Sequence, residues 1–257
     1  MRLTKALFVL PTLFTLSSVF LGMLSIIMSM EGDFFLASLA ILYAILFDMV
    51  DGRVARMTKT QSEFGMQIDS LADVCSFGMA PAVLIYCASL EDLLWFGGNA
   101  SMPVAFLFLA AGAVRLARYN VMASTTTAPV KRFVGIPIPM AAGTLASLVM
   151  ATELRGGAQI PPVVAAVFVV FLAFLMVSTV SYRKFFARNR VEALVLTVIL
   201  VAYLGSVSLV WGPRWLVFGF MAFYITFGFG ETLLLRVLAR RAQATDEEAL
   251  PAEDDDA

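Results

Sequence analysis

The most regular feature of the chain is a series of long apolar runs separated by short polar connections. A membrane-spanning helix needs about 20 largely apolar residues. By that measure the pattern predicts eight helices, at 7–29, 34–56, 67–88, 93–119, 135–152, 160–180, 191–209 and 214–236. The first run is too long for the apolar part of a cleavable signal peptide, and no A-x-A-like site ends it. The predicted fold is all-α, a polytopic membrane bundle of about eight transmembrane helices.

The composition excludes whole classes of protein. Hydrophobic residues make up 60% of the 257 residues and charged residues only 14%, whereas a soluble domain has about 45–50% apolar and about 25% charged residues. The chain has no histidine, which excludes a histidine base, a Ser-His-Asp triad and histidine-ligated metals. Acid–base or metal chemistry must therefore use Asp, Glu, Lys, Arg or Tyr. We also expect no nucleic-acid partner for this chain.

The basic residues predict the orientation of the bundle. Of the 18 Lys and Arg residues, 16 fall at the termini and in alternate connections, which leaves Arg155 and Arg214 on the other side. Basic loops stay in the cytoplasm, so we expect a multi-pass protein of the cytoplasmic (inner) membrane with both termini in the cytoplasm. Residues 1–241 form the expected transmembrane catalytic domain. The acidic segment 242–257 is an expected disordered cytoplasmic tail.

Four aspartates lie in or beside apolar helices, where a charge is costly. Asp48 and Asp51 are three residues apart, and Asp69 and Asp73 are four apart, so each pair shares one helix face. The short connection between the two helices makes them antiparallel neighbours, which lets the pairs face each other. Hard oxygen donors suit Mg²⁺ or Mn²⁺, and two such ions would neutralise the four carboxylates. We therefore expect a divalent metal site that faces the cytoplasm.

Small and basic residues surround these aspartates. Gly52 and Ala55 leave room for a bulky ligand, Gly65 permits a close approach, and Arg56 has the geometry to hold a phosphate oxygen. The same residues have another interpretation, in which Gly and Ala pack helices and Arg56 anchors the helix at the membrane surface.

The complete pattern is Asp48-x2-Asp51-Gly52-x2-Ala55-Arg56-x8-Gly65-x3-Asp69-x3-Asp73. It resembles, at every specified position, the signature of the CDP-alcohol phosphatidyltransferases, membrane enzymes that join an alcohol to a phosphatidyl group from a CDP-linked lipid and release CMP. The resemblance implies a two-metal centre held by Asp48, Asp51 and Asp69, with Asp73 at the metals as general base. It also implies a CDP-lipid pocket formed by Gly52, Ala55, Arg56 and Gly65.

Four further stretches resemble the phosphatidylserine synthase branch of that family. They are LADVCSFGMAP at 71–81, RLARYN at 115–120, FVGIPIPMAAG at 133–143 and VSTVSY at 177–182. PTLFT at 11–15 resembles the opening of that branch, with Thr12 where an asparagine commonly stands, and we add Thr15 to the expected CDP-lipid pocket. CDP-diacylglycerol and L-serine are the implied substrates, and the family resemblance also implies a homodimer in the lipid bilayer.

A serine carboxylate needs a guanidinium and hydrogen-bonding groups in its pocket. Arg115, Arg118 and Asn120 end the fourth predicted helix, and Arg132 precedes the fifth, so we expect them to bind serine. As ordinary cytoplasmic anchors, the same basic residues would contact lipid phosphates instead. Glycerol 3-phosphate or inositol phosphate would also suit a cationic pocket. A cation transporter is the alternative from another class, because intramembrane carboxylates can line an ion path.

Overall fold

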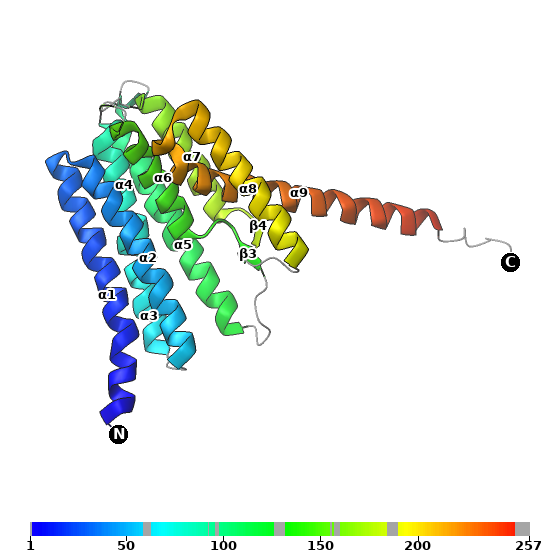
Figure 1. Cartoon of the computed structure of the whole chain (residues 1–257), viewed down its shortest axis with the longest axis horizontal. Helices are drawn as coiled ribbons and strands as arrows, with labels where there is room; N and C mark the ends of the chain where they lie inside the picture. Colours follow the sequence, from blue (N-terminus) through cyan, green and yellow to red (C-terminus); the bar gives the residue numbers. More distant parts are fainter. Residues whose placement is uncertain are drawn as a thin grey trace.

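The computed structural model describes residues 2–58, 63–91, 93–95, 98–125, 132–154, 156, 160–183 and 190–249. These residues form a helical bundle with two short antiparallel strand pairs (Figure 1). The first half contains α1 (Arg2–Glu31), α2 (Phe34–Thr58), α3 (Glu63–Asp73), the π-helical segment η1 (Val74–Met79), α4 (Ala80–Ile85), the π-helical segment η2 (Tyr86–Leu90), β1 (Leu94–Trp95), β2 (Gly98–Asn99) and α5 (Ser101–Thr125). The second half contains β3 (Arg132–Val134), α6 (Ile138–Glu153), α7 (Pro162–Val177), β4 (Ser181–Arg183), α8 (Arg190–Trp211), the 3₁₀ turn η3 (Pro213–Trp215) and α9 (Leu216–Ala249).

The helices are those that the apolar pattern predicts. Within the described residues, six helical stretches are long and apolar enough to cross a membrane, and α6 and α7 are shorter apolar helices. All eight coincide in place with the predicted spans, so the prediction of a polytopic helical membrane bundle is confirmed. The third stretch is one continuous helical run through α3, η1, α4 and η2.

The two largest differences between predicted and observed boundaries are at the start of the fourth span and at the end of the last one. The fourth span begins at Ser101 rather than at 93 because β1 and β2 pair antiparallel just before it. Helix α9 runs to Ala249, so residues 242–249, predicted to be disordered, are helical. The reason is local, because alanine, glutamine and glutamate, which fill much of this segment, are strong helix formers. Residues 250–257 of the predicted tail lie outside the described residues.

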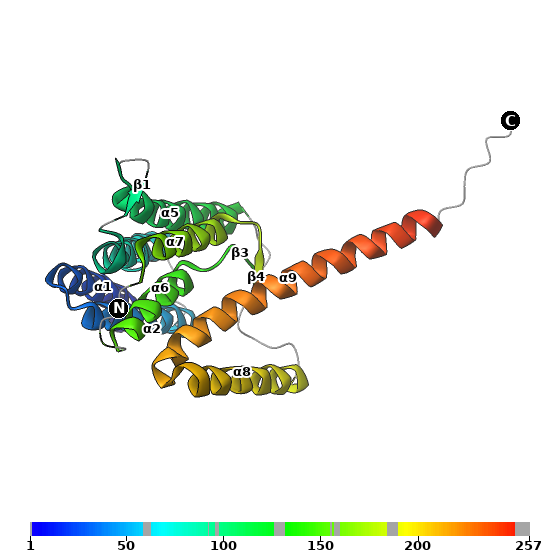
Figure 2. The same cartoon turned by 90° about the horizontal axis from the view of Figure 1, so that it is seen from above.

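Small residues let the central helices approach closely. Helix α6 is the most enclosed, with Ala141, Ala142, Gly143 and Ala146 among its buried residues, and it packs against α2 and α9. Close contact through small side chains is the usual way in which helices associate in membranes. Figure 2 shows α9 passing between α6 and α8 before it extends away from the bundle.

Helix α1 makes a close crossing with η1. A Cβ on Gly22 would lie 2.8 Å from the Ser76 Cα, and the Ser76 hydroxyl donates a 2.9 Å hydrogen bond to the Ser18 carbonyl. The helical hydrogen bonding is irregular here, because Pro81 has no N–H to donate to the preceding turn. Since η1 follows Asp73 directly, this crossing sets the position at which α3 carries its last carboxylate.

Candidate metal and acceptor site

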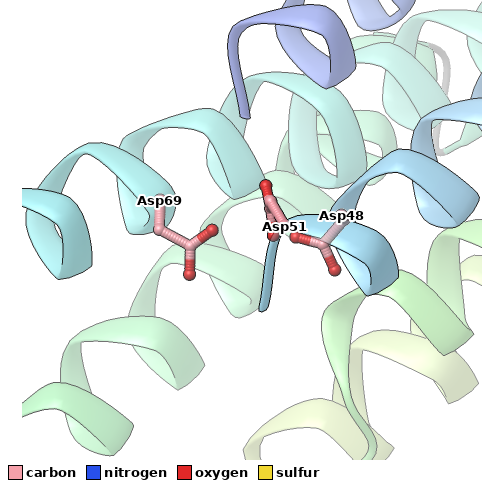
Figure 3. A group of neighbouring side chains, drawn as sticks. All are labelled: Asp48, Asp51 and Asp69. Carbon is pink, nitrogen blue, oxygen red and sulfur yellow. The ribbon is translucent and has the colours of Figure 1, made fainter. Parts of the chain in front are cut away.

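Three of the predicted metal ligands come together between the second half of α2 and the second half of α3. One carboxylate oxygen from each of Asp48, Asp51 and Asp69 lies within 4.8 Å of the others. Figure 3 shows Asp48 and Asp51 on α2 and Asp69 on α3, with Asp51 between the other two. Asp51 is buried, and Asp48 and Asp69 are half-buried.

Neighbouring helices hold these carboxylates in place. Helix α1 packs on both α2 and α3, and its Thr15 hydroxyl donates a 2.9 Å hydrogen bond to Asp51 Oδ2. Thr15 is itself buried. The predicted CDP-lipid residue Thr15 therefore contacts a predicted metal ligand directly.

Asp73, the last residue of α3, lies beside this group. Its carboxyl shares a side-chain hydrogen bond with Asp48 and interacts electrostatically with Asp69 and with Arg115. The structure thus brings three carboxylates to one point and places the fourth against one of them. Four carboxylates in so small a space repel one another unless cations sit among them. The set offers only hard oxygen donors, and it fits Mg²⁺ or Mn²⁺.

The other predicted CDP-lipid residues flank the carboxylates in sequence. Gly52 follows Asp51 on α2, Gly65 lies in the first half of α3, and both are half-buried. Ala55 and Arg56 belong to α2, but their side chains lie outside the described part of the structure. Their contact with a nucleotide stays a prediction.

Arg115 is the predicted serine-binding residue nearest to the carboxylates. It is only 6% exposed, and its Nε has no hydrogen-bond partner among the described residues. It interacts electrostatically with Asp73 of α3 and with Tyr224 of α9. A buried guanidinium with an unused donor is costly unless an anion joins it.

Arg118, one turn further along α5, is engaged by the backbone. Its Nη1 donates to the Val177 carbonyl at 2.8 Å, and its Nη2 donates to the Val134 carbonyl at 3.1 Å. Two longer bonds from Nη2 reach the carbonyls of Met176 and Ser178 at 3.3 and 3.4 Å. Arg118 therefore joins α5 to the end of α7 and to β3 through its two terminal nitrogens, and its contact with a substrate stays a prediction.

The remaining predicted serine-binding residues also differ from Arg115. Asn120 donates a 2.9 Å hydrogen bond to the Ser70 hydroxyl, which connects α5 to α3 near Asp69. Arg132 begins β3, and its side chain lies outside the described part of the structure. For these two residues a substrate contact stays a prediction.

A stacked pair of tyrosines, one of which interacts with Arg115, had no role in the sequence-based prediction. Tyr182 of β4 stacks on Tyr224 of α9, with ring centroids 5.9 Å apart and an interplanar angle of 24°. Tyr182 lies in the VSTVSY stretch, but nothing in that pattern distinguishes it from a packing residue. Tyr224 lies in an aromatic-rich helix, where one more tyrosine carries no signal.

Comparison with known proteins decides the family. The sequence profile of the CDP-alcohol phosphatidyltransferases matches residues 8–228. The chain belongs to this family. Members of the CDP-alcohol phosphatidyltransferase family generally use divalent metal ions, and the carboxylate cluster is a suitable site for them.

Several relatives carry more specific names. A CDP-diacylglycerol–serine O-phosphatidyltransferase of Helicobacter pylori is 37% identical over 235 residues, which cover 90% of this chain and 94% of the relative. An archaetidylserine synthase of Methanothermobacter thermautotrophicus is 37% identical over 180 residues, covering 68% and 70% of the two chains. A CDP-diacylglycerol–serine O-phosphatidyltransferase of Methanocaldococcus jannaschii is 36% identical over 172 residues, covering 66% and 72%.

Proposed function

We propose that this family member transfers a phosphatidyl group from CDP-diacylglycerol to L-serine, which yields phosphatidylserine and CMP. The carrying observation is the convergence of Asp48, Asp51 and Asp69 within 4.8 Å, beside Asp73 and the buried Arg115. The names of the relatives supply the choice of serine, because those proteins are called serine phosphatidyltransferases or an archaetidylserine synthase.

The divalent ions, expected to be two Mg²⁺ or Mn²⁺, would be held by Asp48, Asp51 and Asp69, with Asp73 beside them. When bound, these ions neutralise the pyrophosphate and polarise the phosphorus that is attacked. The chain's own part is to fix the ligands, and the Thr15 hydroxyl does so for Asp51.

Asp73 is the proposed general base. It takes the proton of the serine hydroxyl as the serine oxygen forms its bond to the β-phosphorus of CDP-diacylglycerol. The bond from that phosphorus to the CMP oxygen breaks, and CMP leaves with the electron pair. Arg115 lies within electrostatic reach of Asp73, which suits it to hold the serine carboxylate while the hydroxyl faces the base.

The nucleotide end of the lipid is proposed to lie against Gly52, Ala55, Arg56 and Gly65, on the cytoplasmic side of the membrane. The excess of basic residues in alternate connections supports this orientation. Glycine and alanine leave the helix surface open for a large headgroup. A site at the membrane surface suits a reaction between a lipid and a soluble alcohol.

The test is an assay of the purified protein in detergent with CDP-diacylglycerol, Mg²⁺ or Mn²⁺, and labelled L-serine. We expect a labelled lipid and an equal amount of CMP. Label from glycerol 3-phosphate or an inositol phosphate in place of serine would refute the acceptor. Metal flux in liposomes without CMP release would instead support a transporter. The expected homodimer is tested separately, by measuring the mass of the detergent-solubilised particle.

A further inference from the structure

A series of buried polar groups extends from the carboxylate site toward α9. Asp73 of α3 interacts electrostatically with Arg115 of α5, Arg115 with Tyr224 of α9, and Tyr224 with Tyr182 of β4. The first of these groups belongs to the proposed reaction centre. Tyr224 and Tyr182 belong to α9 and β4, to which the proposed reaction assigns no role.

Within the described part of the chain, two of these groups have buried polar atoms that make no hydrogen bond. Tyr182 is 0% exposed, and its hydroxyl has no hydrogen-bond partner among the described residues. The Nε of Arg115 likewise has no hydrogen-bond partner among the described residues. Buried polar atoms are nearly always paired in folded proteins, and each unpaired one costs about 1–3 kcal/mol. Two such atoms in one connected group indicate a place prepared for a ligand.

The position of the Tyr182 ring is strongly constrained. Its strand β4 pairs with β3, with Tyr182 opposite Phe133, and its ring stacks on Tyr224. On α9 the ring lies against Gly228, where an added Cβ would be 2.8 Å from Tyr182 Cε1. Only glycine leaves room for the ring there. The hydroxyl is therefore held by rigid packing and is not a side chain that has simply turned inward.

The chemistry of the group suits a carboxylate. Arg115 supplies a positive charge and N–H donors, and burial raises the pKa of Tyr182 to about 12, so its hydroxyl remains a donor. Arg115 is the cation with a buried N–H that makes no hydrogen bond among the described residues. The guanidinium of Arg118, which lies within electrostatic reach of Arg115, donates to backbone carbonyls instead. The N–H of Arg115 and the hydroxyl of Tyr182 are two donors, which match the two oxygens of a carboxylate.

We propose that Arg115, Tyr182 and Tyr224 form the subsite that binds the carboxylate of the acceptor amino acid, which makes α9 a wall of the active site. The inference rests on the proposed function, in which serine is the acceptor. The serine hydroxyl then lies toward Asp73, at the opposite end of the group from Tyr182. Acceptors without a carboxylate would give Arg115 Nε and the Tyr182 hydroxyl no partner and would be discriminated against.

The direct test uses Tyr182→Phe and Tyr224→Phe, which remove one hydroxyl each and keep the stacked rings. For Tyr182→Phe we expect the KM for serine to rise roughly 10- to 100-fold, as for the loss of one hydrogen bond to a charged group. The KM for CDP-diacylglycerol and the kcat should change less than about twofold by the same reasoning. Tyr203→Phe is the matched control, because Tyr203 lies on α8 with its ring against Phe223, and it should leave all three values unchanged.

A second readout separates binding from damage to the fold. Serine methyl ester keeps the hydroxyl and amine but lacks the carboxylate charge, and it is compared with serine as a competing acceptor. The preference of the wild type for serine should shrink in Tyr182→Phe and in Tyr224→Phe. An unchanged serine KM in both variants, or an equal loss for serine and its ester, would overturn the subsite. If the wild type itself transfers to an alcohol other than serine, the proposed function fails, which is a separate outcome.

Discussion

The Thr15 hydroxyl on α1 donates a 2.9 Å hydrogen bond to Asp51 Oδ2 on α2, and both residues are buried. This bond connects a helix that carries none of the aspartates to the carboxylate cluster. It also restrains the orientation of the Asp51 carboxylate beside Asp48 and Asp69. Hydrogen bonds of this kind orient metal ligands and typically change metal affinity when they are lost.

Thr15→Val should lower the affinity of the site for its metal ions. We expect the Mn²⁺ concentration for half-maximal activity to rise about tenfold, which is the lower end for loss of a group that supports a ligand. Thr15→Ser keeps the hydroxyl and should behave like the wild type. The measurement is activity as a function of Mn²⁺ concentration at saturating substrates. Equal metal dependence in Thr15→Val and the wild type would contradict a supporting role.

Substitutions of Asp69 and Asp73 should distinguish a role in metal binding from a role in proton transfer. Asp69 belongs to the three-carboxylate group, and Asp73 lies against Asp48 beside it. We expect Asp69→Asn to lose both Mn²⁺ binding and turnover. Asp73→Asn should lose about 10²- to 10⁴-fold in kcat, as for a missing general base, and keep more of the Mn²⁺ binding. Paramagnetic resonance of Mn²⁺ in titrations of each variant measures the binding. If Asp73→Asn binds no Mn²⁺, the main role of Asp73 is to bind metal and not to accept a proton.

Arg118→Ala should reduce stability more than serine binding. It removes hydrogen bonds to the Val177 and Val134 carbonyls, which join α5 to the end of α7 and to β3. The expected loss in unfolding free energy is about 2–4 kcal/mol, as for charge-assisted bonds to groups that stay buried. Unfolding in detergent measures it, with the exposed Arg53→Ala on α2 as the control. A stable Arg118→Ala variant with a large rise in serine KM would assign Arg118 to the substrate.

Gly22→Ala should destabilise the crossing of α1 with η1. The new Cβ would lie 2.8 Å from the Ser76 Cα, and a backbone atom cannot move aside without shifting the helix. Overpacking of this kind costs about 1–3 kcal/mol. Gly205→Ala on α8 is the control, since its Cβ would meet nothing within 4 Å and alanine favours a helix. Thermal unfolding in one detergent compares both variants, and equal melting temperatures would contradict the close crossing.

Most of the fold was predictable from the apolar pattern, because a helix in lipid must be long and apolar whatever its neighbours are. The spacing of Asp48 and Asp51 also predicted a shared helix face, and the structure places both beside Asp69. Arg118 was not predictable in the same way. Its partners are backbone carbonyls at 134 and 176–178, and a carbonyl has no identity in the sequence. The stack of Tyr182 on Tyr224 depends on the space at Gly228, which only the packing of β4 on α9 reveals.

The shortness of α6 and α7 has a consequence for how the bilayer meets the protein. Each helix has 16 residues, or about 24 Å at the usual rise, against a hydrocarbon thickness of about 30 Å. Next to Arg118, β3 precedes α6 and β4 follows α7. The backbone of such strands cannot face lipid tails without satisfied polar groups. Because α6 is enclosed, the apolar length that faces lipid is shortest along α7. A water-soluble alcohol that arrives beside α7 crosses a shorter hydrocarbon distance than it would beside α1 or α5.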